Sequence, residues 1–185
     1  MVERAAMSIS TRTGDEGLTG LLYGQRVAKD HPQIEALGAC DELNAAIGLA
    51  RAAGGRAEVL LPIQHDLVAL MGEVACAEVD SARYLESKFK KLDAAALSRV
   101  DLAAAALEAR GLRFDGWATP GAGPLSAAFD QARVVARRAE RHLVGLPTRA
   151  GRTVRPVVLA YVNRVSDLLW LLAREAEQDL LPPAN

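Results

Sequence analysis

Apolar residues recur at three- and four-residue spacing in five segments of this 185-residue chain. That period is typical of helices that bury one face, so each segment predicts a helix. The predicted helices cover residues 33–53, 60–80, 92–110, 125–144 and 156–176. Gly54-Gly55, Gly111 and the stretch from Gly145 to Pro147 end three of them. The simplest architecture is an all-α, single-domain bundle of five helices with mostly antiparallel neighbours.

The composition narrows the class of protein further. The hydrophobic fraction is 50% but the aromatic fraction only 4%, so the core is built from Ala, Leu and Val, which favours close-packed helices. With 22 Lys+Arg against 23 Asp+Glu the formal net charge is −1, without the basic excess of nucleic-acid-binding proteins. No apolar run approaches the roughly 20 residues of a membrane span. Residues 1–10 lack the apolar region of a secretory signal. Cys40 and Cys76 form no CxxC pair, and we expect them to be reduced thiols in a cytoplasmic protein.

The fourth predicted helix carries Arg133, Arg137 and Arg141 at positions i, i+4 and i+8, which makes one cationic ridge along the helix. Arg138 stands beside this arginine ridge, and Glu140 is interleaved with it. The ridge is either a solvated face on which Glu140 relieves the repulsion between like charges, or an anion site. The second interpretation follows because the guanidinium fork matches phosphate oxygens in geometry and charge.

Residues 11–33 are rich in Gly and polar side chains and predict a structured loop ahead of the first helix. The segment from Thr11 to Gly20 holds three glycines, three threonines and Arg12. Glycine lets backbone N–H groups approach phosphate oxygens, and threonine hydroxyls add donors, so this segment is a candidate phosphate-binding loop. It lacks the Lys of the GxxxxGK[ST] motif, which excludes a standard P-loop. Lys29 offers a further positive charge.

Polar residues also interrupt the apolar faces of the first and fifth predicted helices. On the first helix they are Asp41, Glu42 and Asn44. On the fifth helix they are Asn163, Ser166, Asp167, Trp170 and Arg174, whose spacing places them on one face. These residues are either partly buried pairs that fix the register of the helices or the lining of a cleft. The absence of ExxH, GxSxG, CxxC and HExxH motifs argues against di-iron, hydrolase, dithiol and zincin sites.

Four motifs cover most of the chain. They are Thr11-Arg12-Thr13-Gly14-Asp15-x-Gly17, Glu35-Ala36-Leu37-Gly38-x-x-Asp41-Glu42-Leu43-Asn44, Ala132-Arg133-x-x-x-Arg137-Arg138-Ala139-Glu140-Arg141 and Val162-Asn163-Arg164-Val165-Ser166-Asp167. In this order they resemble the PduO-type ATP:cob(I)alamin adenosyltransferase family. The resemblance implies a five-helix bundle that assembles as a homotrimer and binds ATP in clefts between adjacent subunits.

The resemblance also implies roles for individual residues. The family's N-terminal loop wraps the triphosphate, which implies ATP contacts for Thr11, Arg12, Thr13, Gly14, Asp15, Gly17, Leu18, Thr19, Gly20 and Lys29. The family's arginine helix and one further Asn contact the same nucleotide, and they correspond to Arg137, Arg138, Glu140, Arg141 and Asn163. A salt bridge between subunits corresponds to Asp41 and Arg133. The cobalamin pocket corresponds to Trp117, Asp41, Asn44, Ser166 and Asp167.

The activity that the resemblance implies is attack of the cob(I)alamin cobalt on the 5′-carbon of ATP, which forms adenosylcobalamin and releases inorganic triphosphate. The nucleophile belongs to the cofactor, so the protein positions the reactants and stabilises the leaving group. Arg137 and Arg141 are the catalytic candidates for that stabilisation, together with Mg²⁺ carried by the ATP phosphates rather than by assigned protein ligands.

Trp117 is the third catalytic candidate. The family excludes the lower axial ligand of the cobalt with apolar side chains, and Trp117 stands where a Phe is usual. An indole can fill the same space, although its N–H group requires a hydrogen-bond acceptor. Glu16 is a second departure, because a Lys is common between Asp15 and Gly17.

On this interpretation residues 1–185 form one domain, with a flexible N-terminus at 1–10, a nucleotide-binding loop at 11–33 and a helical bundle at 34–180. A reductase and an adenosylcobalamin-dependent acceptor enzyme are implied partners, and neither nucleic acid nor a membrane is expected. The alternative function is a non-catalytic bundle that binds ATP or a corrinoid as a sensor or cofactor carrier. A purely structural bundle, in which the arginine ridge is only a subunit contact, is a further alternative.

Overall fold

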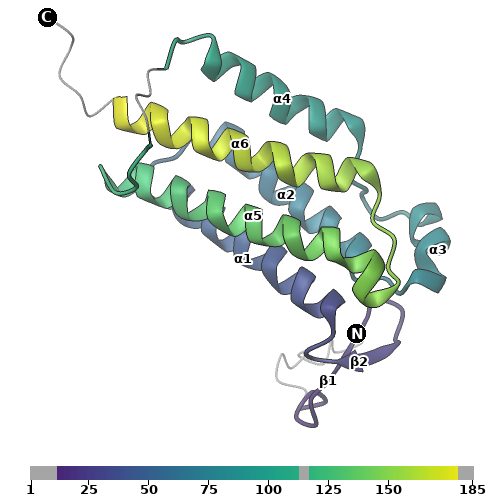
Figure 1. Ribbon diagram of the computed structural model, residues 1–185. Helices are drawn as coiled ribbons and strands as arrows, with labels where there is room; N and C mark the ends of the chain where they lie inside the picture. Colours follow the sequence, from purple (N-terminus) through teal and green to yellow (C-terminus); the bar gives the residue numbers. More distant parts are fainter. Residues whose placement is uncertain (1–11, 113–116, 179–185) are drawn as a thin grey trace, which may run out of the picture.

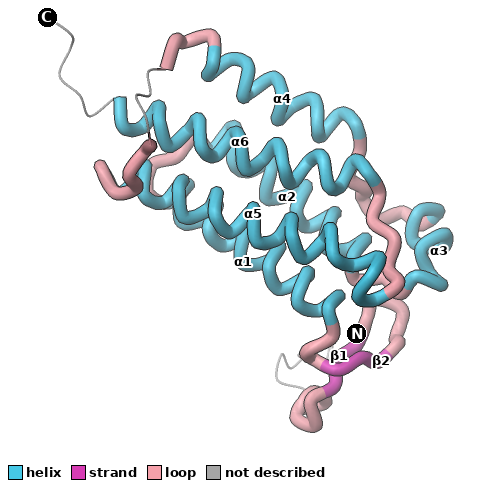
Figure 2. The backbone as a smooth tube through the Cα atoms, in the orientation of Figure 1, coloured by secondary structure: helices cyan, strands magenta, loops and turns pink. Residues whose placement is uncertain are grey.

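The computed structural model describes residues 12–112 and 117–178, and these fold as a helical bundle (Figures 1 and 2). The long helices are α1 (Pro32–Ala52), α2 (Ala57–Val74), α4 (Ala94–Glu108), α5 (Pro124–Ala150) and α6 (Pro156–Gln178). Smaller elements are strands β1 (Leu18–Gly20) and β2 (Arg26–Ala28), the 3₁₀ helix η1 (Glu78–Asp80) and the short helix α3 (Ser81–Glu86). The predicted all-α bundle is therefore confirmed, with one short helix and a hairpin added in the described part of the chain.

Helix α5 packs against α1 on one side and α6 on the other (Figure 1). Helix α2 packs on α1 and lies behind α5 and α6 in Figure 1, and α4 packs on α6. Fully buried leucines from each of these layers, including Leu43, Leu67, Leu143 and Leu168, form one continuous core. The predicted dependence of the core on Leu, Val and Ala is confirmed, since Tyr84, Phe129 and Tyr161 are its few buried aromatic side chains among the described residues.

Helix α6 is apolar because of its place in this core. By length and composition alone, α6 is long and apolar enough to cross a membrane. The same holds for α2 and the segment η1–α3 taken together, although the chain bends sharply between them. More than half of the apolar stretch of α6 is buried against other helices of the chain. Core helices of bundles commonly meet that test, so the apolar character of α6 is explained by packing.

Two helix ends differ from the prediction, and each has a tertiary cause. Helix α5 continues through Pro147 and ends at Gly151, which has a left-handed φ of +61°. The next residue, Arg152, is buried and donates to the Cys76 and Glu73 carbonyls, both at 2.9 Å, which determines where the chain leaves the helix. The predicted helix end at residues 145–147 is therefore wrong, because the contacts of Arg152 outweigh the local signal of Pro147.

Helix α2 begins before Pro62 and ends at Val74, six residues short of the predicted end. The side-chain amide of the buried residue Gln33 donates to the Val74 carbonyl at 2.6 Å and to the Cys76 carbonyl at 2.8 Å. These bonds satisfy carbonyl groups at the helix end that would otherwise be unpaired. The chain then turns into η1 and α3, which the polar composition of this stretch did not reveal.

The segment predicted as a structured loop contains the antiparallel hairpin β1–β2, in which Leu18 pairs with Ala28. Strands of three residues are too short to show a period of two in the sequence. Gly24 has a φ of +95° in the connecting turn, a conformation that favours glycine. Both Cys40 and Cys76 are free and buried, as predicted.

Candidate functional site

The arginine ridge lies on the outer face of α5. Alanines at positions 132, 136 and 139 are fully buried between α5 and its neighbours, so the guanidinium groups of Arg137 and Arg141 point away from the core and are exposed. Arg141 Nη1 donates to the Arg137 carbonyl at 3.1 Å. In the described part of the chain neither guanidinium forms an ion pair. Their positive charges are therefore available to an anion.

On the α6 side of the ridge, Asn163 Nδ2 donates to Glu140 Oε1 at 3.1 Å. On the α1 side, Arg138 forms an ion pair with Glu42. A cavity of about 360 Å³ opens between α1 and α5 at this point, and its walls include Glu35, Gly38, Glu42, Arg138 and His142. The five residues on α5 and α6 that are predicted to contact ATP thus lie along or beside this ridge.

The N-terminal segment is folded into a defined loop. A Cβ atom placed on Gly14 would lie 3.1 Å from Lys29 Nζ, so the two predicted ATP-binding residues lie side by side. Gly17 has a φ of +78°, and its carbonyl accepts from the Lys29 backbone N–H at 2.9 Å. Arg12 has an unusual positive φ of 57° for a residue with a side chain. Thr11 lies outside the described residues.

The other predicted loop residues follow this hairpin. Thr19 pairs with Val27 and Gly20 with Arg26 in the strands, while Leu18 and Asp15 are exposed. Glu16, the second departure from the family pattern, is also exposed. Its carboxylate is therefore free to point to solvent rather than toward a bound phosphate.

Two side chains that sequence reasoning missed hold the loop in place. Arg26 Nη2 donates to the Thr13 carbonyl at 2.7 Å and to the Leu18 carbonyl at 3.3 Å. Gln25 bonds to Asp80 of η1, and the backbone N–H of Leu22 donates to the Ala75 carbonyl at 2.9 Å. No motif marks these residues. The contacts of Gln25 and Leu22 reach a segment more than fifty residues away in the sequence, and those of Arg26 are to carbonyl groups within the loop itself. The loop is thereby attached to the end of the bundle at which α1 begins (Figure 1).

The residues predicted for the cobalamin pocket are less closely gathered. Asp41 is exposed on α1, and Asn44 lies at the contact with α2, where its carbonyl accepts from Gln64 Nε2 at 3.0 Å. Ser166 is buried, while Asp167 is exposed 3.7 Å from Arg164 and borders a cavity of about 290 Å³ between α4 and α6. Trp117, ahead of α5, is 100% exposed.

Asp41 and Arg133, the predicted pair between subunits, form no ion pair with each other in the described part of this chain. Arg133 Nε instead lies 3.4 Å from Asp130 Oδ1, one turn earlier on the same helix. Asp41 influences a neighbour by charge, since burial and then Asp41 raise the pKa of the Cys40 thiol to about 12. A bridge between subunits stays a prediction.

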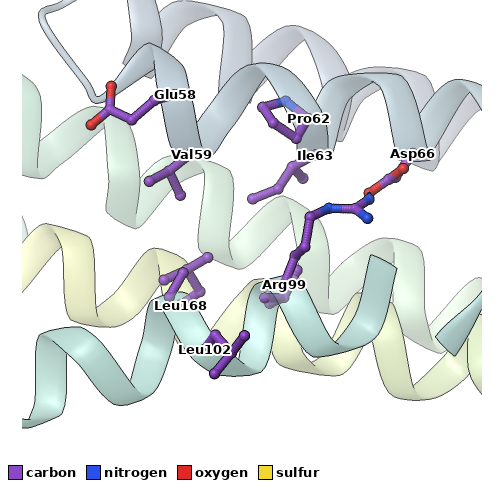
Figure 3. A pocket seen from close by; sticks show the side chains of 10 residues that line it. Glu58, Val59, Pro62, Ile63, Asp66, Arg99, Leu102 and Leu168 are labelled. Atoms are coloured by element: carbon purple, nitrogen blue, oxygen red, sulfur yellow. The ribbon is translucent and has the colours of Figure 1, made fainter. Parts of the chain in front are cut away.

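A separate cavity of about 250 Å³ lies between α2 and α4 and has mostly apolar walls (Figure 3). The buried carboxylate of Asp66 closes one end, and Arg99 points toward it from α4 (Figure 3). Asp66 accepts from Lys90 and Arg99, each at 2.7 Å, and from the Tyr161 hydroxyl at 3.1 Å. Burial and the Asp66 charge raise the pKa of Tyr161. Because both carboxylate oxygens of Asp66 accept hydrogen bonds, this cluster links α2 to α4 and α6 rather than offering a reactive group.

Among residues 12–112 and 117–178, no group of three or more His, Cys, Asp or Glu side chains could hold a metal ion. The ridge and the loop offer the groups that bind an anion, namely arginine side chains and a glycine-rich segment.

Comparison with known proteins shows the family to which the chain belongs. Residues 9–176 match the family described as cobalamin adenosyltransferase. The chain is 39% identical over 180 residues to the corrinoid adenosyltransferase PduO of Salmonella typhimurium, covering 94% of this chain and 51% of that protein. It thus spans about half the length of the PduO relatives. Over 172 residues it is 36% identical to the corrinoid adenosyltransferase of Mycobacterium leprae, covering 91% and 90% of the two chains.

Solved structures are similar over nearly the whole chain. One is a variant of the PduO-type ATP:corrinoid adenosyltransferase from Lactobacillus reuteri complexed with cobalamin and ATP, with a TM-score of 0.81, 27% identity and coverage of 95% and 97% of the two chains. Another variant of that protein, complexed with ATP, has a TM-score of 0.78 and 26% identity, with coverage of 92% and 94%.

Proposed function

This chain belongs to the cobalamin adenosyltransferase family, and from that premise we propose that it transfers the 5′-deoxyadenosyl group of ATP to the cobalt of cob(I)alamin. The products are adenosylcobalamin and inorganic triphosphate. The observation that carries the proposal is that one chain presents both Arg137 and Arg141, exposed on α5 without an ion pair among the described residues, and a glycine-rich loop attached at the start of α1. The complexes of the Lactobacillus reuteri protein with cobalamin and ATP support the choice of substrates.

The reaction is a displacement at carbon. The cobalt of cob(I)alamin donates an electron pair to C5′ of ATP, the C5′–O bond breaks, and its electrons leave with triphosphate. Charge therefore accumulates on the triphosphate as the reaction proceeds. Arg137 and Arg141 stabilise that charge, since a positively charged group placed beforehand is most effective where charge develops.

The remaining ATP contacts hold the nucleotide in place for this attack. The loop from Thr11 to Gly20 and Lys29 surround the triphosphate, while Arg138, Glu140 and Asn163 orient the rest of the nucleotide. Mg²⁺ is carried by the phosphates, since the described residues offer no group of metal ligands. We assign no step to the metal ion.

The corrin is held by residues that lie apart in one chain, namely Trp117, Asp41, Asn44, Ser166 and Asp167. We propose that a homotrimer brings them together, with each site between two subunits and with Asp41 bridging to Arg133 of the neighbour. A fully exposed Trp117 supports this, because a large apolar side chain is unusual on a surface that nothing covers. The whole chain acts as one catalytic unit in the cytoplasm, supplied by a reductase and delivering its product to an acceptor enzyme.

The test is an anaerobic assay with MgATP and chemically reduced cob(I)alamin, in which light-sensitive adenosylcobalamin and inorganic triphosphate are followed together. Equal amounts of both products establish the reaction. Tight ATP binding without either product would instead support a sensor or cofactor carrier, and no ATP-dependent rise in the unfolding temperature would support a purely structural bundle.

A further inference from the structure

Arg174 on α6 is a cation buried inside the bundle. Its side chain is 3% exposed, and its Nη2 atom donates to Asp130 Oδ2 on α5 at 2.6 Å and to Glu177 Oε1 at 2.7 Å. The ring of Trp170 lies over the guanidinium with 5.7 Å between them. Asp130 is itself only 5% exposed, so the ion pair between α6 and α5 is shielded from water.

The same carboxylate reaches the arginine ridge. Its other oxygen, Asp130 Oδ1, lies 3.4 Å from Arg133 Nε, and Arg133 is the first member of the ridge. Across the residues that the structure describes, Asp130 is the one carboxylate paired with Arg133. Because that contact uses Nε, both Nη groups of Arg133 are left for an acceptor outside this chain.

This arrangement is a poor way to stabilise a core. Two buried charges lose their hydration, and apolar side chains of similar size in their place are often neutral or stabilising. In addition, Arg174 Nε and Nη1 are buried without a hydrogen-bond partner in the described part of the chain. Buried donors without a partner lower the free energy of unfolding. The Arg174–Asp130 pair is therefore better explained by a role other than stability.

We infer that Arg174 is a positioning residue for the arginine ridge. It fixes the carboxylate of Asp130, which fixes Arg133 Nε and thereby holds the two Nη groups in the orientation that meets Asp41 of a neighbouring copy. The contact between Arg133 and Asp41 of a neighbouring copy is part of the proposed function, and the inference rests on it.

The test replaces the buried pair by apolar residues of similar size in the double variant R174M/D130L and compares it with R133A. We expect the double variant to keep the unfolding temperature of the parent. Its kcat should fall about tenfold, as in R133A, while the KM for ATP changes less than about twofold, since the nucleotide-binding arginines are untouched. The triple variant should be no slower than R133A, because both changes remove the same contact.

A control exchanges another ion pair, in which the carboxylate is buried and the arginine is half-buried. Glu73 and Arg155 are joined at 2.5 Å at the far end of α2, with no contact to Arg133. In E73L/R155M combined with R133A, any losses of kcat should multiply as for independent sites. A normal kcat in R174M/D130L, or a triple variant slower than R133A by the product of the two losses, would overturn the inference.

Subunit association gives a readout that does not need catalysis. Molar mass is measured by light scattering over a dilution series. R133A and R174M/D130L should dissociate at the same protein concentration as each other, and that concentration should be higher than for the parent. R174K should lie between them and the parent, because a lysine keeps the charge but lacks the guanidinium fork. If the parent protein makes no adenosylcobalamin, the proposed function fails while this measurement still decides the inference. Unchanged association in R174M/D130L would then overturn it.

Discussion

Asn163 on α6 holds the carboxylate of Glu140 on α5, with 3.1 Å between Nδ2 and Oε1. Glu140 is the acidic residue that stands among the ridge arginines in the sequence, so it was the candidate for neutralising them. Because its carboxylate is directed to Asn163, it is not paired with Arg137 or Arg141 in the described residues. This relationship favours an anion site over a solvated face on which Glu140 relieves the repulsion.

Replacing Arg137 or Arg141 by Ala should therefore weaken turnover strongly. Each change removes a charge-assisted contact to the triphosphate, a loss on the order of 2 to 4 kcal/mol in kcat/KM. Initial rates at varied MgATP measure it. Arg149→Ala is the matched control, because Arg149 is an exposed arginine in the last turn of the same helix. Near-normal kcat/KM in both R137A and R141A would exclude the anion-site assignment.

The contact between Gly14 and Lys29 gives a second prediction. A β-carbon on Gly14 would lie 3.1 Å from Lys29 Nζ, so Gly14→Val should displace the ammonium group from its place in the loop. The KM for ATP should rise by roughly five- to tenfold, about 1 kcal/mol or slightly more, as in Lys29→Ala. The double variant should be no worse than K29A, since both changes remove one contact.

Lys88→Ala is the control for this pair of variants, because Lys88 is exposed on the chain after α3. Its KM for ATP should equal that of the parent. Losses in G14V and K29A that multiply in the double variant would show that Gly14 acts independently of Lys29.

The bundle was predictable because its signal is local. Buried apolar residues at three- and four-residue spacing, such as Leu43 and Ile47, indicate one face of a helix within a few turns of sequence. The arginine ridge was predictable for the same reason, since residues four apart on a helix share a face.

What was missed depends on contacts between distant segments. Arg152 sets the end of α5 through carbonyl groups near residue 75, and Gln25 attaches the loop to Asp80 of η1. No spacing rule connects these positions. Likewise, Asn44, Trp117 and Asp167 correspond to the cobalamin pocket of a family, but they lie on different segments of the chain and no local spacing relates them.

Mg²⁺ dependence should follow ATP rather than the protein. Because the described residues hold no group of metal ligands, treatment with EDTA should leave the unfolding temperature of the free protein unchanged. The same treatment should abolish adenosyl transfer, and added Mg²⁺ should restore it. Both effects are measured by thermal unfolding and by the assay on one sample. A lower unfolding temperature after chelation would reveal a structural metal site instead.

Trp117 should matter for the corrin and not for the nucleotide. Its indole is fully exposed in the chain and available to cover the lower face of a bound corrin. Trp117→Ala should leave ATP affinity unchanged but slow turnover that starts from cob(II)alamin by at least about tenfold, a barrier change of about 1.4 kcal/mol. Trp117→Phe should retain most of the rate. The spectrum of four-coordinate cob(II)alamin provides the direct check, and its persistence in W117A would remove this role from Trp117.

Cys40 should make the protein sensitive to alkaline pH. Burial, with a smaller contribution from Asp41, raises the pKa of this thiol from its ordinary value of 9.0 to about 12. The folded state therefore keeps the proton where the unfolded state releases it. Its contribution to stability is complete below pH 9 and is lost as the pH rises toward 12.

Between these limits the free energy of unfolding should fall by about 1.4 kcal/mol per pH unit on account of this one group. Cys40→Ala should be less stable at neutral pH, because it removes a buried side chain, yet its stability should decline less steeply with pH. Urea unfolding at several pH values from about 8 to about 10.5 compares the two slopes. Tyr84, whose pKa burial raises from 10.0 to about 12, adds the same decline to parent and variant and so cancels in the difference. Equal slopes in the parent and C40A would mean that the thiol ionises as readily in the folded state as in the unfolded one.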